Sequence, residues 1–211
     1  MSGRMVIDAS QLPEGETDHR SLIWWGNFLL LLVETTVFGL LLACYFYYRQ
    51  NFSGFPPPRV HDLPVIYHPV PDLELPSINM MLLLVSCVPM FCADRLCLKK
   101  DPNERLVGLA LAVVVLFGFL IAGLRFAEFS SIHFKWNENA YASTVWLFLG
   151  MHLFHIFTGT LELLLMLAWT CVKQLDVKHA RDIRVTAVYW YWLAGIWVPL
   201  YIILFWGPRW F

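Results

Sequence analysis

The sequence predicts an all-α membrane protein with five transmembrane helices, on the strength of its composition and its apolar segments. The chain of 211 residues is 58% hydrophobic and 15% charged, and its mean hydropathy is +0.58. A soluble domain of this size would expose too much apolar surface, so we assign the membrane class. Five apolar segments are long enough to cross a bilayer, which takes about 20 helical residues. The net charge of −1 argues against a nucleic acid partner.

The expected crossings cover residues 22–48, 77–98, 105–130, 142–172 and 184–207. The first opens on Trp24-Trp25 and closes on a tyrosine-rich stretch, and such aromatic ends mark the two membrane interfaces. The last crossing is expected to end at Gly207-Pro208, since this pair is a helix stop signal.

Two segments lie outside the crossings and complete a single membrane domain over 22–211. Residues 1–21 form a polar N-terminal segment, which is unlike the apolar core of a cleavable signal peptide. Residues 49–76 contain seven prolines, and we expect them to form an external loop without helix.

Lysine and arginine predict the orientation of the crossings. Ten of the 15 Lys and Arg residues lie on the side of the N-terminus, four lie on the opposite side, and Arg125 falls within the third crossing. Basic residues favour the cytoplasmic side, so we expect the N-terminus inside and the C-terminus outside.

The sequence shows no motif for independent catalysis. It contains no Gly-rich phosphate loop, no Ser-His-Asp pattern and no Cys-x-x-Cys pair among its five cysteines. We therefore expect no catalytic residue in this chain and a packing role for the cysteines.

The fourth crossing carries an unusual polar face, formed by His152, His155, Gly159 and Glu162. Their spacing of three, four and three residues places them on one side of a helix, which must meet protein or an internal cavity. Two histidines three residues apart cannot reach opposite faces of one haem iron, and the Glu-x-x-His pairs of di-iron bundles are absent. We therefore expect hydrogen-bonded histidines at a helix contact, with Gly150 and Gly159 allowing close helix approach.

Three other crossings contain polar residues that need partners. Glu34 lies near the middle of the first crossing, where it either hydrogen-bonds a neighbouring helix or tunes a proton path or lipid site. Asn79 is expected to bond across helices. Arg125 and Glu128 are spaced as helical neighbours, which indicates an ion pair at the interface, with binding of a lipid phosphate by Arg125 as the alternative.

Together these motifs resemble subunit III of the haem–copper oxygen reductases, over roughly residues 24–207. The matching positions are Glu34 before an aromatic helix end, Pro76-x-x-Asn79 before leucines, Arg125-x-x-Glu128-Phe129, and Gly150-x-His152-x-x-His155-x-x-x-Gly159. Five crossings match the short form of the family. The family's His and Asp in the last helix are replaced by Tyr191 and Ala194, which indicates a divergent branch.

The resemblance implies an accessory subunit of a respiratory terminal oxidase, which couples reduction of O2 to proton translocation. It implies no cofactor in this chain, haems and copper in partner subunits I and II, and bound phospholipid. It also implies support of subunit I and of proton uptake, a bacterial inner membrane location, and possible membership of a larger supercomplex. The polar residues expected to line an intramembrane cleft or a subunit or lipid contact are Glu34, Asn79, Arg125, Glu128, His152, His155 and Glu162.

Several alternatives stay open at this stage. The partner could be a cytochrome c oxidase, a quinol oxidase or a nitric oxide reductase. From other classes, a self-sufficient membrane haem or metal enzyme would retain metal on the isolated chain. A small transporter would show inverted repeats and broken helices, and neither is evident in the sequence.

Overall fold

All the secondary structure in the described part of this computed structural model is helical. The described residues are 21–51, 55, 70–99, 102–173, 175 and 177–210. The elements are α1 (Leu22–Asn51), α2 (Glu74–Cys97), α3 (Glu104–Ser131), α4 (Ala140–Val172), α5 (Val177–Tyr201), a π-helical turn (Ile202–Trp206) and α6 (Gly207–Trp210). Five segments are long and apolar enough to cross a membrane, the last of them spanning Lys178–Trp210. The predicted all-α fold with five crossings is therefore confirmed.

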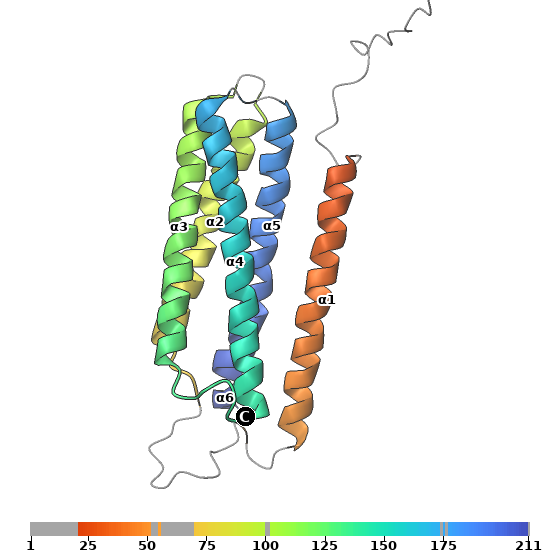
Figure 1. Ribbon diagram of the computed structural model, residues 1–211, viewed down its shortest axis with the longest axis vertical. Helices are drawn as coiled ribbons and strands as arrows, with labels where there is room; N and C mark the ends of the chain where they lie inside the picture. The colour runs from red at the N-terminus through yellow and green to blue at the C-terminus, as the bar shows by residue number, and fades with distance from the viewer. Residues whose placement is uncertain are drawn as a thin grey trace, which may run out of the picture.

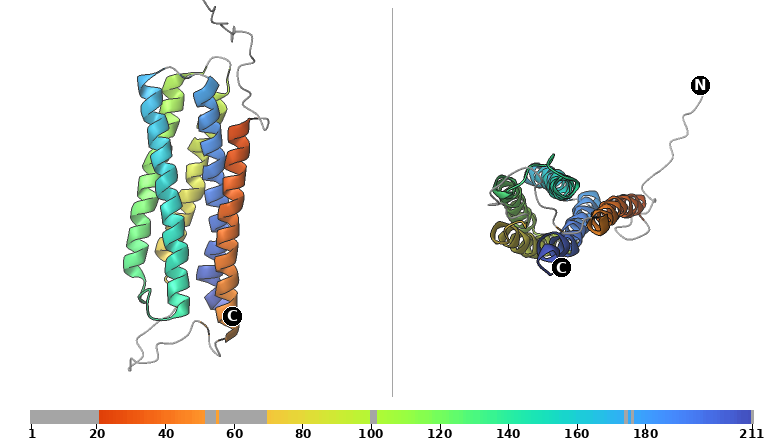
Figure 2. Two further views of the ribbon diagram at one scale, coloured as in Figure 1. Left: turned by 45° about the vertical axis from the view of Figure 1, so that its right-hand side comes forward. Right: turned by 90° about the horizontal axis from the view of Figure 1, so that it is seen from below.

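Four helices form a bundle and the first helix stands beside it. Helices α2 to α5 pack side by side, whereas α1 contacts α4 and α5 from outside (Figures 1 and 2). Helices α1, α3 and α5 begin at one end of the bundle, here called the N-terminal end, and α6 lies at the opposite, C-terminal end. The orientation of these ends relative to a membrane stays a prediction.

Helix α1 packs through a narrow seam. Its buried side chains are Leu31, Phe38 and Tyr45, which lie seven residues apart. This spacing is that of a coiled-coil seam, in which one position of every heptad faces the partner helix. Glu34 lies three residues after Leu31 and therefore on the edge of the same seam.

Glycines allow close packing at two places on α4, but not at both predicted ones. A Cβ atom on Gly159 would lie 3.0 Å from the ring of Tyr189 on α5, so this contact is close as predicted. A Cβ on Gly150 would have nothing within 4 Å, and the prediction for that glycine was wrong. The tightest contact is instead between Gly118 on α3 and Thr160 on α4, where the Cβ would lie 2.2 Å from Oγ1.

Two proline signals were misread at helix ends. Helix α2 begins at Glu74, so Pro76 lies in its first turn, where its missing N–H has no helical acceptor. Helical structure also continues through Pro208 to Trp210, since this proline lies in the first turn of α6. The predicted loop 49–76 is thus helical at both edges. Most of that loop (52–54 and 56–69) and residues 1–20 lie outside the described residues.

Candidate functional site

The predicted polar residues gather in two clusters on neighbouring sides of α4. We call Asn79, Arg125, Glu128, His152 and Trp197 the core network, since they meet inside the α2–α5 bundle. We call Glu34, Thr35, His155 and Trp192 the α1 network, since they join α1 to the bundle. His152 and His155 are one turn apart on α4, so a single helix contributes a histidine to each cluster.

The core network is centred on an ion pair without access to solvent or lipid. Arg125 Nη1 and Glu128 Oε2 are 2.5 Å apart, and each residue is 1% exposed. Asn79 Nδ2, on α2, donates to the other carboxylate oxygen of Glu128 over 2.7 Å. The carboxylate thus links α2 and α3, which confirms that Asn79 bonds across helices.

His152 extends the core network to α5. Its Nδ1 lies 3.3 Å from Arg125 Nη2, and its Nε2 lies 3.2 Å from the carbonyl oxygen of Leu193. A guanidinium has only donors, so Nδ1 accepts and Nε2 carries the proton that is donated to the carbonyl. The two contacts therefore fix one tautomer of the ring.

Trp197 on α5 covers both cationic and imidazole groups of the core network. Its ring stacks on His152 with centroids 4.0 Å apart, and the Arg125 Cζ atom lies 4.2 Å from the Trp197 ring centroid. An arginine over a tryptophan face is attracted to the π electrons, more strongly when the pair is desolvated. The core network thus joins four helices without exposing its charges.

The α1 network attaches α1 through two polar contacts. Glu34 Oε2 lies 3.0 Å from His155 Nε2, and Thr35 Oγ1 accepts from the indole N–H of Trp192 over 2.9 Å. His155 Nδ1 lies 2.7 Å from the carbonyl oxygen of Met151 and must donate to it. Nε2 then either carries a second proton or accepts one from the Glu34 carboxyl, so one proton lies between them.

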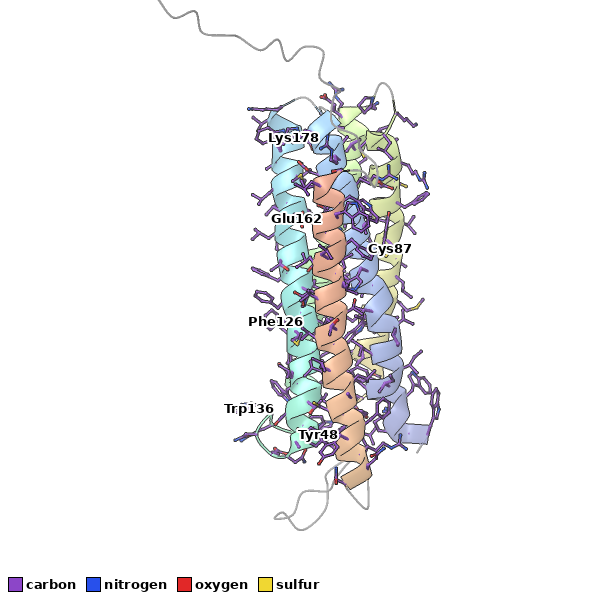
Figure 3. The ribbon with its side chains drawn as sticks, turned by 90° about the vertical axis from the view of Figure 1, so that its right-hand side faces the viewer. Tyr48, Cys87, Phe126, Trp136, Glu162 and Lys178 are labelled. Carbon is purple, nitrogen blue, oxygen red and sulfur yellow. The ribbon has the colours of Figure 1, made fainter. Side chains whose placement is uncertain are left out.

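Glu162 follows the α1 network along α4 toward the N-terminal end. Figure 3 shows it between the levels of Lys178 and Phe126. Its Oε1 accepts from Thr186 Oγ1 on α5 over 2.7 Å, although the Glu162 side chain is exposed on this chain. The predicted polar face of α4 therefore meets α5 and α1, and its last residue, Glu162, lies at the exposed side of the bundle.

The spacing of Arg125 and Glu128 predicts their ion pair, which is present. The pair is buried in the bundle, because α2, α4 and α5 all turn polar or aromatic groups toward it. Its depth in a membrane stays a prediction. Sequence reasoning missed the roles of Trp192, Trp197 and Thr186. The clustering of tryptophans in the last crossing pointed to Trp192 and Trp197, whereas no pattern singled out Thr186.

The ring nitrogens of the two histidines on α4 all have partners within the protein. Both ring nitrogens of His152 and both of His155 are engaged by groups of the protein. Among the residues that the structure describes, no group of three or more His, Cys, Asp and Glu side chains has the arrangement of a metal site. What these residues can do is hold helices together and share a proton between Glu34 and His155.

Comparison with known proteins links the whole membrane part to one family. The profile of the family described as "Cytochrome c oxidase subunit III" matches residues 8–209. Cytochrome c oxidase subunit 3 of Pan troglodytes is 24% identical over 178 residues, covering 84% of this chain and 67% of that protein. The protein of the same name from Petromyzon marinus is 27% identical over 183 residues (86% and 68%). That of Myxine glutinosa is 24% identical over 204 residues (87% and 77%).

Proposed function

This chain belongs to the cytochrome c oxidase subunit III family, and on that premise we propose that it is an accessory, cofactor-free subunit of a respiratory haem–copper terminal oxidase. In this role it packs against the subunit that reduces O2, holds phospholipid between its helices and supports proton uptake. The expected partners are subunits I and II, within a larger supercomplex in some membranes. We expect a bacterial cytoplasmic membrane as its location.

The observation that carries the proposal is how the intramembrane polar groups are used. Burying such groups in a bilayer is costly, and they commonly serve a cofactor, a transport path or a helix contact. Here Arg125, Glu128 and both histidines bond other helices of the same chain. These bonds join the helices and engage the ring nitrogens of His152 and His155 within the chain, which supports a scaffold role. A scaffold is what an accessory subunit contributes.

Glu162 supports a contact with a partner or a lipid. Its carboxyl has one bond, to Thr186, and is otherwise exposed at the side of the bundle. An ionisable group at this depth does not face hydrocarbon alone, so a second polar surface is expected to cover it. A neighbouring subunit or a lipid headgroup would meet that need.

The test is to purify the tagged chain in mild detergent with its co-purifying subunits. The reduced-minus-oxidised spectrum and the metal content are then recorded before and after this chain is stripped off. We expect the haem signal and copper to stay with the larger subunits. Haem or iron retained by the stripped 24.5 kDa chain would overturn the proposal.

Variant chains sharpen that test. His155→Gln removes the α1 network contact and should leave the haem spectrum of the complex unchanged, because His155 is engaged by Met151 and Glu34. Trp136→Ala replaces an exposed side chain in the loop between α3 and α4. It is the matched control for losses of the complex during purification. A spectral shift caused by His155→Gln and not by Trp136→Ala would point to a ligand role for the histidine.

A further inference from the structure

Three buried polar atoms of the core network have no hydrogen-bond partner among the described residues: Asn79 Oδ1, Arg125 Nε and Trp197 Nε1. Each of these residues is 1% exposed, so bulk water does not reach the three atoms. Buried polar groups nearly always have a partner, because leaving one unpaired away from water costs free energy. Three such atoms in one cluster therefore indicate a ligand that belongs to the network.

The three residues come together from different helices. Asn79 on α2 bonds the carboxylate of Glu128, which also pairs with Arg125 on α3. Trp197 on α5 lies against that arginine, with 4.2 Å between its ring centroid and Arg125 Cζ. Arg125 Nε is bonded directly to Cζ, so it lies beside the indole. The unpaired atoms thus belong to side chains that meet in one small region of the bundle.

A second tryptophan shows that an unpaired indole is not a general feature of α5. Trp190 lies seven residues before Trp197 and is also buried, at 0% exposed. Its indole N–H donates to Ser86 Oγ over 2.9 Å. Trp197 has no acceptor of this kind among the residues that the structure describes, and stacking on His152 fixes its ring. Its acceptor is therefore expected to be a small molecule held beside it.

The chemistry of the three atoms selects the ligand. Arg125 Nε and Trp197 Nε1 only donate, whereas Asn79 Oδ1 only accepts, since Nδ2 is the amide atom on the Glu128 carboxylate. A ligand that pairs with all of them must both accept and donate, which a chloride ion does not do. The charges of Arg125 and Glu128 balance, so an added ion would also leave a net charge in the bundle. The smallest neutral molecule that accepts and donates is water.

We propose that the core network binds one buried water molecule, which accepts from Arg125 Nε and Trp197 Nε1 and donates to Asn79 Oδ1. Three hydrogen bonds are typical of a buried water, and a space of about 10–15 Å³ is enough to hold it. The water joins α2, α3 and α5 and completes the hydrogen bonds of the network. The proposal concerns the packing of this chain and does not depend on membership of an oxidase.

X-ray radiolysis followed by mass spectrometry tests the proposal on the complete chain in mild detergent, with any subunits that co-purify. X-ray pulses make hydroxyl radicals from water where it lies, so a bound water oxidises the side chains around it. Water labelled with heavy oxygen traces the added atom to water. Trp197 should be oxidised several times faster than Trp190, after each rate is divided by that of the unfolded chain. Phe205, which is 2% exposed and closer to the chain end, should stay as protected as Trp190 and is the control for entry of bulk water.

Two matched variants test whether the indole N–H holds the water. Trp197→Phe keeps an aromatic ring but removes the N–H, so the water loses one of its partners. Oxidation of His152, which stacks on Trp197, should then fall severalfold. Trp190→Phe removes an indole N–H that is paired with Ser86 and should leave oxidation of His152 unchanged. Circular dichroism checks that both variants are folded, and the comparison of Trp197 with Trp190 in the unchanged chain needs neither of them.

Each outcome decides for or against the water site. Faster oxidation of Trp197 than of Trp190, with loss of His152 oxidation in Trp197→Phe alone, supports it. Equal protection of the two tryptophans overturns it, as does unchanged or increased oxidation of His152 in Trp197→Phe. Oxidation of Phe205 at the rate of Trp197 also overturns it, since bulk water then enters from the end of the crossing. Oxidation of Trp197 that rises when chloride is replaced by gluconate shows an anion in the site and contradicts the proposal as well.

Discussion

Removing the Glu128 carboxylate should strongly destabilise the protein, although the residue lies only three positions before the end of α3. The variant Glu128→Leu keeps an apolar side chain of similar size but leaves Arg125 without its counter-ion. Arg125 is 1% exposed, so its guanidinium cannot turn to water. Asn79 also loses the acceptor of its 2.7 Å hydrogen bond.

The magnitude follows from the bonds that are lost. Each hydrogen bond to a charged group contributes about 1.5–3 kcal/mol, and the carboxylate makes two of them. Breaking a buried ion pair by removing one partner costs about 3–5 kcal/mol, which agrees. Arg125→Met should fall in the same range, because it leaves a buried carboxylate with one partner. Either loss is a large part of a typical folding free energy of about 5–15 kcal/mol.

The double variant Arg125→Met/Glu128→Leu should cost less than the two single changes together. It removes both charges at once and leaves two neutral groups without a partner, the Asn79 amide and His152 Nδ1, at about 1–3 kcal/mol each. The two single costs sum to roughly 6–10 kcal/mol, so a double-mutant cycle should give a coupling of about 3 kcal/mol.

Unfolding by SDS titration in mixed micelles, followed by circular dichroism at 222 nm, measures these costs. Asp72→Asn is the control, since Asp72 pairs with His133 over 3.3 Å at the surface, where both side chains are more than half exposed. That change should cost about 0–1 kcal/mol. Additive single variants, or a Glu128→Leu cost no larger than that of Asp72→Asn, would refute a buried and coupled ion pair.

Two further predictions concern helix contacts. Gly118→Ala should cost about 1–3 kcal/mol in the same titration, because its Cβ would overlap Thr160. Gly150→Ala has open space around it and should be neutral or stabilising by up to about 1 kcal/mol, and equal effects of the two variants would contradict this packing. Glu34→Leu should weaken attachment of α1 by about 0.6–1.7 kcal/mol and speed amide hydrogen exchange in α1 alone. Glu34→Gln should change little, because its amide can donate to His155. Faster exchange throughout the bundle would contradict a local role.

The helices could be predicted from the sequence because a bilayer permits few alternatives. Backbone groups in hydrocarbon must bond within their own segment, so a long apolar run becomes a helix whatever its neighbours are. The errors occurred at proline. Pro76 was taken as the end of a loop, yet a proline in the first turn of a helix is allowed, and the sequence does not say which case applies.

The sequence identified the polar residues of the site, but it predicted only some of the contacts that they make. The i, i+3 spacing is enough to pair Arg125 with Glu128, since it depends on one helix alone. Whether that pair is buried depends on where α2 and α5 lie, and the sequence carries no direct record of this. The same reason explains why Gly150 was wrongly expected to be a packing position: its helix face meets open space.

The position of α1 follows from how helices associate in a membrane. Lipid tails are as apolar as leucine side chains, so burial of α1 against the bundle gains little from the hydrophobic effect. Its narrow seam supplies few close contacts, and polar bonds must supply much of the remainder. Those bonds lie in the first half of the helix: Asn27 Nδ2 to the Val185 carbonyl oxygen, Glu34 with His155, and Thr35 with Trp192. Glu34, whose position in the middle of the first crossing suggested a functional acid, therefore also has a structural role. Its replacement should first be judged by whether α1 stays attached, before any change in oxidase activity is assigned to proton transfer.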